Sequence, residues 1–451
     1  MPENLSDLLW GPYTALAIFM AGLYLGIKTR FFYMRHPLLV FKETLGKLLR
    51  KPGGKGSVSP FQAMSIALGG TMGTGNITGV ATAIAMGGPG AVMWMWLSAM
   101  AGMVLKYAET VLAMDTRIKG RDGYEGSPMQ YMKLVPGAGI LSILFAAALL
   151  CAAFFGGNMV QTNAAAAMGE WMGVPPLATG LAIGVVVLVL SFGGIKSVAD
   201  ALSLLVPFMT VAYLGASGWA IYQGREAIGE LIVDMVTSAF GLRQLTGGLT
   251  GYTVSQALRY GMARGLFSNE AGFGTAPIAH AASSETRPAV QGMWGIMEVL
   301  IDTIICCTAT AIVVLLVPEG LDPALSGAQI TAGAFGALIG PVFEGMVAIF
   351  TIIFALTSIL GWYVYGEAAV KVLIGPHKWV ITLYRFIYGG TCVIGAVMMP
   401  GLAWQLTDIA SWLMMVINLP IVLILASRIS RVTDQYLREI ENGRDKKRQT
   451  R

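Results

Sequence analysis

Two short stretches place glycines beside hydroxyl and amide side chains inside otherwise apolar segments. The first is LGGTMGTGNITG, from Leu68 to Gly79, and the second is GLFSNEAGFGTAP, from Gly265 to Pro277. Such residues are poor helix formers, so each stretch is predicted to break a helix. A break frees backbone N–H groups at one helix end and carbonyls at the other. The N–H end suits an anionic group such as a carboxylate, and the carbonyl end suits a small cation.

Two carboxylates lie inside apolar segments, where ionisable residues are rare and typically functional. Asp302 lies about eleven residues into the segment 291–316, near its middle at a rise of roughly 1.5 Å per residue. It can ligate an ion or take up a proton. Glu270 lies in the second glycine-rich stretch, and its partner is either the ammonium group of a bound molecule or a buried residue such as Arg264. The sequence leaves both alternatives open.

Hydroxyl, aromatic and amide side chains also interrupt two other apolar segments. Thr357 and Ser358 are adjacent in the segment 343–366, where their hydroxyls either bind a cation or bond back to a carbonyl one turn earlier. Trp362 lies one turn after Ser358 on the same face, so it is a candidate wall of a pocket. Gln161, in FFGGNMVQTNAAAAM, is a further pocket candidate.

The chain as a whole has the composition of a polytopic membrane protein. Of its 451 residues, 55% are hydrophobic and 12% are charged, against roughly 25% charged in soluble domains. Many apolar runs reach the ~20 residues that cross a bilayer. The cysteines have no metal-binding spacing and are predicted to be small core residues. The three histidines, His36, His280 and His377, have no metal-binding spacing either and are predicted to be interfacial or loop residues. The formal charge of +5 comes mainly from loops and the tail, so we expect no nucleic-acid partner.

Eleven membrane-spanning segments are predicted from the apolar runs. They are Tyr13–Thr29, Pro60–Met86, Ala91–Met114, Gly139–Met168, Pro176–Gly194, Ala199–Tyr222, Thr253–Ala282, Gln291–Leu316, Phe343–Gly366, Val380–Met399 and Leu402–Ala426. Lys and Arg gather in the loop 28–55, the stretch 117–133 and the tail 428–451, whereas the loop 317–336 has neither. Because such residues favour the cytoplasmic side, the N-terminus is predicted to lie outside and the C-terminus in the cytoplasm.

The two glycine-rich breaks fall in the second and seventh segments, which run in opposite directions by the charge count. This spacing predicts two five-helix units of inverted topology, each opening with a discontinuous helix, as in many secondary transporters. Unwound backbone at membrane depth is tolerated only where it is buried or lines a cavity. The predicted organisation is an extra N-terminal helix with a basic cytoplasmic loop (1–58), a first repeat (59–222), an external loop with a surface helix (223–252), a second repeat (253–426) and a basic cytoplasmic tail (427–451).

Other classes of protein fit the sequence less well. GTGNITG has the spacing GxGxxxG in a membrane segment, so it is not a dinucleotide fingerprint. Close helix packing is the alternative for any single glycine, but it does not explain Thr74 and Asn76. The motifs HExxH and GxSxG are absent from the sequence, so no enzymatic function is predicted. A channel would favour a filter-like repeat, whereas two non-identical breaks favour alternating access.

Three stretches carry a resemblance to a known family: GTGNITGVATAIAMGGPGAVMWMW, GMVLKYAE and GLFSNEAGFGTAPIAHAA. They resemble the alanine or glycine:cation symporter family, and the resemblance covers essentially the whole chain. It implies an all-α polytopic membrane protein with about eleven transmembrane helices. The implied fold is the LeuT-type 5+5 inverted repeat, spans 2–6 and 7–11, with one extra N-terminal helix. The implied activity is Na+-coupled uptake of a small neutral amino acid.

The resemblance also implies roles for individual residues. The amides of Thr74 and Gly75 match the place that receives the substrate carboxylate, and two phenylalanine rings match the place that closes over the substrate. Glu270 departs from the family pattern, which has a small polar residue there. The candidate substrate-binding residues are Gly73, Thr74, Gly75, Asn76, Gln161, Phe267, Asn269, Glu270, Gly272, Phe273, Ser358 and Trp362. The candidate Na+ ligands are Gly69, Thr71, Met72, Asn76, Ser268, Asp302, Thr357 and Ser358.

The expected function is therefore Na+-coupled symport of alanine, glycine or both, around a mid-membrane site between the two broken helices. Small residues such as Gly69, Gly70, Ala271 and Gly272 are expected to line the breaks and leave little volume for a side chain. A proton-coupled transporter, or one of the same fold with another substrate, is the alternative. The expected partners are the substrate and membrane lipids, with no protein partner required. The expected location is the plasma or inner membrane.

Overall fold

The computed structural model describes residues 9–48, 58–120, 123–241, 249–322, 325–399 and 401–449 of the 451-residue chain. Nearly all of this is helical, apart from a small antiparallel hairpin of β1 (Ile118–Lys119) and β2 (Tyr124–Glu125). Some charges used for the topology prediction, such as Glu3, Asp7 and Lys55, lie outside the described residues.

Each predicted span coincides with one helix or with a pair of helices, and shorter helices lie between the spans. Those of the N-terminal half are α2 (Pro12–Lys28), α3 (Phe32–Arg35), α4 (Pro37–Glu43), α5 (Pro60–Thr71), α6 (Thr78–Gly87), α7 (Ala91–Thr116), α8 (Pro128–Tyr131), α9 (Gly139–Phe154), α10 (Gln161–Trp171), α11 (Pro176–Phe192), α12 (Gly194–Gln223) and α13 (Ile228–Ala239). Those of the C-terminal half are α14 (Leu249–Asn269), α15 (Ala276–Ala281), α16 (Pro288–Val299), α17 (Thr308–Leu315), α18 (Gly327–Ile339), α19 (Val342–Leu373), α20 (Lys378–Val397), α21 (Gly401–Ile424) and α22 (Ala426–Gln449). Two π-helical segments, η4 (Phe155–Val160) and η6 (Leu300–Cys307), join α9 to α10 and α16 to α17.

The first predicted break is present between α5 and α6. Helix α5 begins with a capping box between Ser59 and Gln62. Helix α5 ends before Met72, whose ψ of 78° is not helical, and Gly73 has an extended backbone. A single 3-10 turn, η2 (Thr74–Asn76), precedes α6. The break therefore takes backbone groups out of the helical hydrogen-bond ladder.

The second predicted break is present between α14 and α15. Glu270 (φ 51°), Gly272 (φ 90°) and Gly274 (φ 76°) all have left-handed backbone conformations. Glycine adopts this conformation without steric cost, whereas a non-glycine residue such as Glu270 is held there at a cost of order 1–3 kcal/mol. The sequence places glycines at two of the three positions that need them, and the third is a buried glutamate.

The apolar helices make this a multi-pass membrane protein. Among the described residues, seven helices are long and apolar enough to cross a membrane, and three shorter apolar helices accompany them. The breaks divide the second and seventh predicted spans into shorter pieces. The total of eleven spans therefore stays a prediction.

Helices also occur in segments that the sequence analysis described as a loop or a tail. Helix α18 lies in the stretch that was predicted to be a loop after the eighth span, and a capping box of Ser326 and Gln329 begins it. Its 13 residues are too few to cross a bilayer. Helix α22 occupies the basic tail, whereas α13 lies in the stretch 223–252, where a surface helix was predicted. Counting charges does not distinguish short helices from loops.

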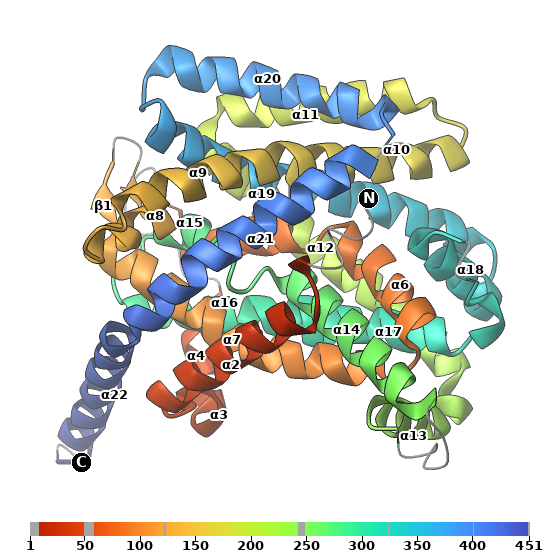
Figure 1. The fold of residues 1–451 in the computed structure, drawn as a ribbon, viewed down its shortest axis with the longest axis horizontal. Coiled ribbons are helices and arrows are strands. Elements are labelled where there is room, and N and C mark those ends of the chain that lie inside the picture. Colours follow the sequence, from red (N-terminus) through yellow and green to blue (C-terminus); the bar gives the residue numbers. More distant parts are fainter. Residues whose placement is uncertain are drawn as a thin grey trace.

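The helices lie in layers (Figure 1). Helices α11 and α20 pack side by side at the top of the view, and α9, α10 and α19 form the next layer. Helix α21 crosses this layer obliquely, and α7, α14 and α16 lie below α21 in the view. Helix α19 packs against both α10 and α5, so it stands between the outer layers and the first break.

Segments that were predicted to be cytoplasmic lie together at one end of the molecule. In Figure 1 the hairpin, α8, α4 and α22 lie toward the left, whereas α13 and α18 lie toward the right. Lys371 at the end of α19 pairs with Glu125 of β2 at 3.2 Å, and Arg428 of α22 pairs with Asp115 of α7 at 2.5 Å. The basic segments therefore share one end, as the charge pattern predicts.

Candidate functional site

The first break packs against α10 on one side and faces open space on another. Gln161 Oε1 accepts hydrogen bonds from the Thr74 N–H and the Thr74 hydroxyl, both at 3.2 Å. A Cβ on Gly73 would lie 2.9 Å from Gln161 Oε1 and 3.1 Å from Ser358 Oγ. A Cβ on Gly75 would meet no atom within 4 Å. The structure thus brings Gly73, Thr74, Gln161 and Ser358 together, with open space beside Gly75.

Helix α19 crosses α5 just before the first break. Ser358 Oγ donates a hydrogen bond of 2.9 Å to the Gly70 carbonyl. Thr357 Oγ1 donates to the Phe354 carbonyl at 2.9 Å, which is the back-bonded alternative that the sequence allowed. The Thr357 carbonyl oxygen lies 3.4 Å from where a Cβ of Gly69 would stand. The end of α5 and the Thr357–Ser358 pair of α19, which were predicted to form one Na+ site, are therefore adjacent.

The glycines of α5 allow this close crossing. A Cβ on Gly69 would lie 3.2 Å from Leu202, and a Cβ on Gly70 would lie 3.0 Å from the Tyr365 hydroxyl. A Cβ on Gly361 of α19 would lie 2.6 Å from the Gly70 backbone. These contacts are close helix packing. Protein atoms therefore occupy the space beside Gly69 and Gly70.

A polar cluster joins both breaks to η6. Asn76 Nδ2 donates to Asp302 Oδ1 at 2.7 Å. Ser268 Oγ and Thr303 Oγ1 donate to Asp302 Oδ2 at 2.9 and 2.7 Å. Asn76 and Asp302 are 0% exposed and Ser268 is 4% exposed. Asn76 Oδ1 is buried and has no hydrogen-bond partner within the described parts of the chain. Such an unsatisfied oxygen is costly in an apolar core.

The chemistry of this cluster fits Na+. Its oxygens belong to a carboxylate, hydroxyls and an amide, which are the ligand types that hard cations prefer. Within the described residues, no group of three or more His, Cys, Asp and Glu side chains is placed to hold a metal ion. Na+ beside Asn76 Oδ1 would satisfy the unpaired oxygen and balance the Asp302 carboxylate. Asn76, Ser268 and Asp302, predicted from three separate spans, thus lie in one cluster.

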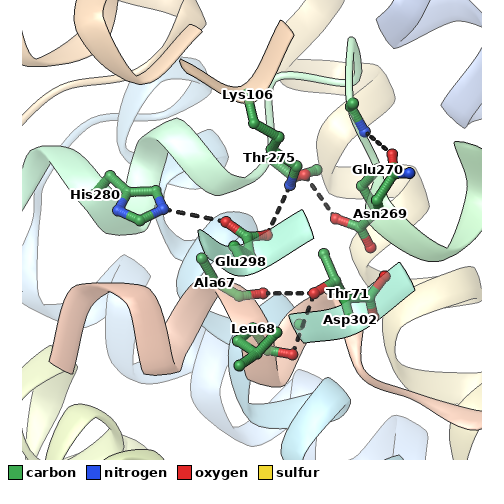
Figure 2. A network of polar contacts seen from close by, with 12 residues as sticks. Ala67, Leu68, Thr71, Lys106, Asn269, Glu270, Thr275, His280, Glu298 and Asp302 are labelled. Carbon is green, nitrogen blue, oxygen red and sulfur yellow. Dashed lines mark hydrogen bonds and ion pairs between the residues drawn. The ribbon is translucent and has the colours of Figure 1, made fainter. Parts of the chain in front are cut away.

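Two other candidate ligands of α5 have protein partners. The Thr71 hydroxyl bonds back to the carbonyls of Ala67 and Leu68 (Figure 2), at 3.3 and 3.2 Å. The Thr71 carbonyl accepts the Gly73 N–H at 2.9 Å. The Met72 N–H donates to the Leu68 carbonyl at 2.7 Å. These bonds hold the end of α5 in place before the chain unwinds.

At the second break, Asn269 and Glu270 are buried and bonded within the break (Figure 2). Asn269 Oδ1 accepts the Ala271 N–H at 3.0 Å, and Glu270 Oε2 accepts the Thr275 hydroxyl at 2.6 Å. Asn269 Nδ2 is buried without a hydrogen-bond partner in the described segments. The break thus holds an amide donor without a hydrogen-bond partner, next to a glutamate whose backbone is left-handed.

A fully buried ionic cluster lies next to the second break (Figure 2). Lys106 Nζ pairs with Glu298 Oε1 at 2.9 Å, and His280 Nε2 lies 3.1 Å from Glu298 Oε2. His280 Nδ1 lies 2.8 Å from Gln291 Nε2, so Nδ1 accepts and the Nε2–H faces Glu298. Lys106 was not among the predicted site residues, although a charge inside an apolar segment marks it as it marks Glu270.

The contacts of this cluster test two predictions from the sequence, one about the partner of Glu270 and one about the location of His280. Lys106 interacts electrostatically with Glu270, whereas Arg264 interacts with Asp408. The partners of Glu270 within the protein are therefore Thr275 and Lys106, and the alternative of Arg264 is not supported. His280 had been interpreted as an interfacial or loop residue. That interpretation is wrong, because His280 is 0% exposed and hydrogen-bonded.

Each of the three aromatic candidates packs against a different aromatic ring. Phe267 packs on Trp404 with ring centroids 6.0 Å apart, and Phe273 packs on Trp10 at 5.6 Å. Trp362 packs edge-on to Tyr365 at 5.6 Å. The Trp362 ring also fills the space beside Gly157, where a Cβ would lie 2.2 Å from it. Trp362 thus packs against η4, whereas Phe273 packs against the N-terminal segment at Trp10.

Solved structures of other proteins share this fold. A Na+-coupled sialic acid symporter in a substrate-bound outward-open state has a TM-score of 0.58 at 11% identity, covering 94% of this chain and 98% of that chain. MhsT in complex with L-phenylalanine has a TM-score of 0.57 at 15% identity, covering 82% and 89%. The fold is the LeuT-type fold of secondary transporters.

Sequence relatives narrow the class to a family. Residues 1–450 match the sodium:alanine symporter family. The sodium/alanine symporter AgcS of Methanococcus maripaludis is 36% identical over 443 residues, 96% of each chain. A Bacillus subtilis protein named probable sodium/glutamine symporter GlnT is 33% identical over 444 residues, 98% of this chain and 91% of that one. The chain belongs to the sodium:alanine symporter family, whose members are transporters. The family resemblance seen in the sequence is confirmed.

Proposed function

We propose that this protein is a Na+-coupled symporter that takes up alanine, glycine or both. Transport proceeds by alternating access around a site between the α5–α6 break and the α14–α15 break, with residues 59–222 and 253–426 as the inverted repeats. The observation that carries the proposal is the Asn76–Asp302–Ser268 cluster. It joins both breaks, and it contains a buried amide oxygen that no group of the described protein satisfies.

The substrate carboxylate is proposed to bind at the backbone of Gly73, Thr74 and Gly75. In the structure the Thr74 N–H donates to Gln161 Oε1. A carboxylate oxygen offers the same acceptor chemistry, so Gln161 moves aside or turns its own amide N–H toward the substrate. The open space beside Gly75 gives the substrate room. The unused Asn269 Nδ2 is a further donor for the carboxylate.

The remaining proposed roles concern the ammonium group and the side-chain space. Glu270 is the proposed counter-charge of the substrate ammonium, shared with Lys106 within the protein. Gly272, Phe267 and Phe273 belong to the same break, and Trp362 approaches from α19. Alanine is favoured because a relative that shares 36% identity over 96% of its length is named a sodium/alanine symporter.

Two Na+ sites are proposed. The first comprises Asn76, Ser268 and Asp302, with the Thr71 carbonyl nearby. The second lies where α19 crosses α5, between the Gly69 and Met72 carbonyls and the Thr357 and Ser358 hydroxyls. At the second site Ser358 Oγ already contacts the neighbouring Gly70 carbonyl at 2.9 Å. Carbonyl and hydroxyl oxygens are suitable Na+ ligands because they are hard donors.

The proposed location is the cell membrane, with the N-terminus outside and the C-terminus in the cytoplasm. The clustering of basic segments at one end supports this orientation by the positive-inside rule. Transport requires the substrate, Na+ and lipid, and needs no protein partner, nucleic acid or catalytic residue. Another substrate remains the second candidate, since a relative that is 33% identical is named a sodium/glutamine symporter.

The deciding experiment is uptake of labelled alanine into proteoliposomes with an imposed Na+ gradient. We expect saturable accumulation above the external concentration, with collapse of accumulation when Na+ is equal on both sides. A proton gradient without Na+ is the matched comparison. Accumulation driven by the proton gradient alone would show that protons, not Na+, are the coupling ions. A linear, non-accumulating flux would indicate a channel.

A further inference from the structure

Asn418 of α21 contacts the second break, although neither the motifs nor the family resemblance assigns it a role. Its Nδ2 donates a hydrogen bond of 2.9 Å to the Gly272 carbonyl. A Cβ on Gly274 would lie 3.3 Å from Asn418 Cγ, so the amide packs directly on the break. Both glycines have left-handed backbones. Asn418 therefore touches the part of the break that has no helical hydrogen bonds to hold it.

Two other buried residues fix the orientation of the Asn418 amide. Nδ2 also donates to Glu109 Oε1 of α7 at 2.5 Å, and Oδ1 accepts the Tyr131 hydroxyl of α8 at 2.5 Å. Asn418, Glu109 and Tyr131 are all 0% exposed. An asparagine amide has two N–H donors and one carbonyl oxygen, and here all of them are used. The amide can neither flip nor rotate without leaving buried polar groups unpaired.

Tyr131 extends this chain of contacts toward the end of the molecule that carries the basic segments. The residues just before it, Ser127 and Gln130, line a cavity of about 980 Å³ together with the hairpin and the end of α19. A displacement of α8 at the edge of this cavity would pull on Asn418 through the Tyr131 hydroxyl. The same displacement would reach the Gly272 carbonyl through a single intervening side chain.

We propose that Asn418 is a positioning residue that holds the second helix break in its substrate-binding geometry and links that break to α8. The inference rests on the proposed function, because it takes this break to be part of the substrate site. Among the hydrogen bonds of the described residues, Asn418 reaches a candidate ligand position only at the Gly272 carbonyl. Its loss would act on substrate affinity by releasing the break, and the Na+ site at Asp302 would keep its own contacts.

The test compares Asn418→Ala with a matched control, Asn163→Ala, in the purified full-length protein. Asn163 also bridges two backbone carbonyls, those of Gly395 and Met398, at 3.1 and 2.9 Å, but these hydrogen bonds join α10 to the end of α20 and not to either break. We expect Asn418→Ala to weaken equilibrium binding of labelled alanine, per mole of folded protein at saturating Na+, by about tenfold or more. Asn163→Ala should stay within about twofold of the unmutated protein.

Amide hydrogen exchange of residues 270–275 gives a readout that needs no substrate. Exchange in this segment should be faster in Asn418→Ala and unchanged in Asn163→Ala, because only the first variant frees the break. If Asn418→Ala does not fold, Tyr131→Phe removes one hydroxyl and keeps the ring. It should shift alanine affinity and exchange in the same direction by a smaller factor.

The outcomes separate this inference from the proposed function. Unchanged exchange at residues 270–275 in Asn418→Ala overturns the claim that Asn418 holds the break. Faster exchange with unaltered alanine binding overturns the claim that it positions the substrate site. If the unmutated protein binds no alanine or glycine, the proposed function fails, and the exchange comparison still decides whether Asn418 holds the break.

Discussion

Replacing Asp302 by asparagine tests the proposed Na+ site most directly, because the change removes a charge and almost no volume. Asp302 accepts hydrogen bonds from Asn76, Ser268 and Thr303, all from neutral side chains. In Asp302→Asn one amide oxygen can still accept from Asn76, and the new N–H groups can donate to the two hydroxyl oxygens. We therefore expect the variant to fold and insert normally.

The loss of Na+ affinity follows from Coulomb's law. A cation beside Asn76 Oδ1 would lie about 4 Å from the Asp302 carboxylate, where two unit charges interact by ~4 kcal/mol at an effective dielectric constant of ~20. At ~1.4 kcal/mol for each factor of ten, the Na+ concentration for half-maximal uptake should rise about 1,000-fold. Na+-driven accumulation would then disappear at any usable Na+ concentration.

The control keeps the charge and removes one hydrogen bond. Thr303→Val deletes a donor to Asp302 Oδ2, which is worth about 1 kcal/mol, so the Na+ requirement should change only about fivefold. The assay is Na+-titrated uptake of labelled alanine, normalised to protein inserted in the membrane. A silent Asp302→Asn variant would falsify the ion-site assignment, because it would show that Asp302 is a protonated structural acid.

Three further predictions use the same uptake assay. Thr357→Ala and Ser358→Ala should each raise the half-saturating Na+ concentration. An unchanged Na+ dependence in both variants would show that the second ion site lies elsewhere. Gly73→Ala should reduce alanine uptake about tenfold or more and lower thermal stability by ~1–3 kcal/mol, since its Cβ would crowd Gln161, whereas Gly75→Ala should keep wild-type stability. Glycine should compete with labelled alanine and D-alanine should be rejected only weakly, because a methyl group is worth only ~1–3 kcal/mol in an apolar pocket. Leucine should compete poorly until Trp362→Ala enlarges the site, and strong inhibition by leucine with none by glycine would contradict the substrate assignment.

Much of the fold could be predicted because the bilayer makes local patterns decisive. Apolar runs mark spans, and a glycine-rich interruption such as 73–76 has few explanations at membrane depth other than a binding site. The family resemblance predicted Asn76 and Ser268 as Na+ ligands and the mid-span charge predicted Asp302, but neither predicted that the three side chains are in contact. Nothing in their sequence separations brings them together.

The rest of the site depends on contacts that a single sequence does not encode locally. Gly69 and Gly70 have the same residue type as Gly73 and Gly75, yet the first two pack against α19 and Gly75 faces open space. The burial of His280 was not predicted, because a histidine near the end of an apolar run is usually interpreted as interfacial. Its partners Glu298 and Gln291 lie on another helix, so the sequence around His280 does not indicate them. Asn418 gave no signal, since one amide in an apolar helix is common.

The π-helical form of η6 makes the Asp302 cluster sensitive to chain length. Asn76 Nδ2 contacts both Asp302 Oδ1 at 2.7 Å and Cys307 Sγ at 3.4 Å, two residues five positions apart. In an α-helix such residues point about 140° apart, whereas the wider turn of a π-helix brings them to one face. Deleting one residue between 303 and 306 would leave Asp302 and the present Cys307 four positions apart, and ordinary α-helical winding would then keep them about 40° apart on one face. Inserting one residue there would instead turn Cys307 and the contacts beyond it away from Asn76, so in this span an insertion should be more damaging than a deletion.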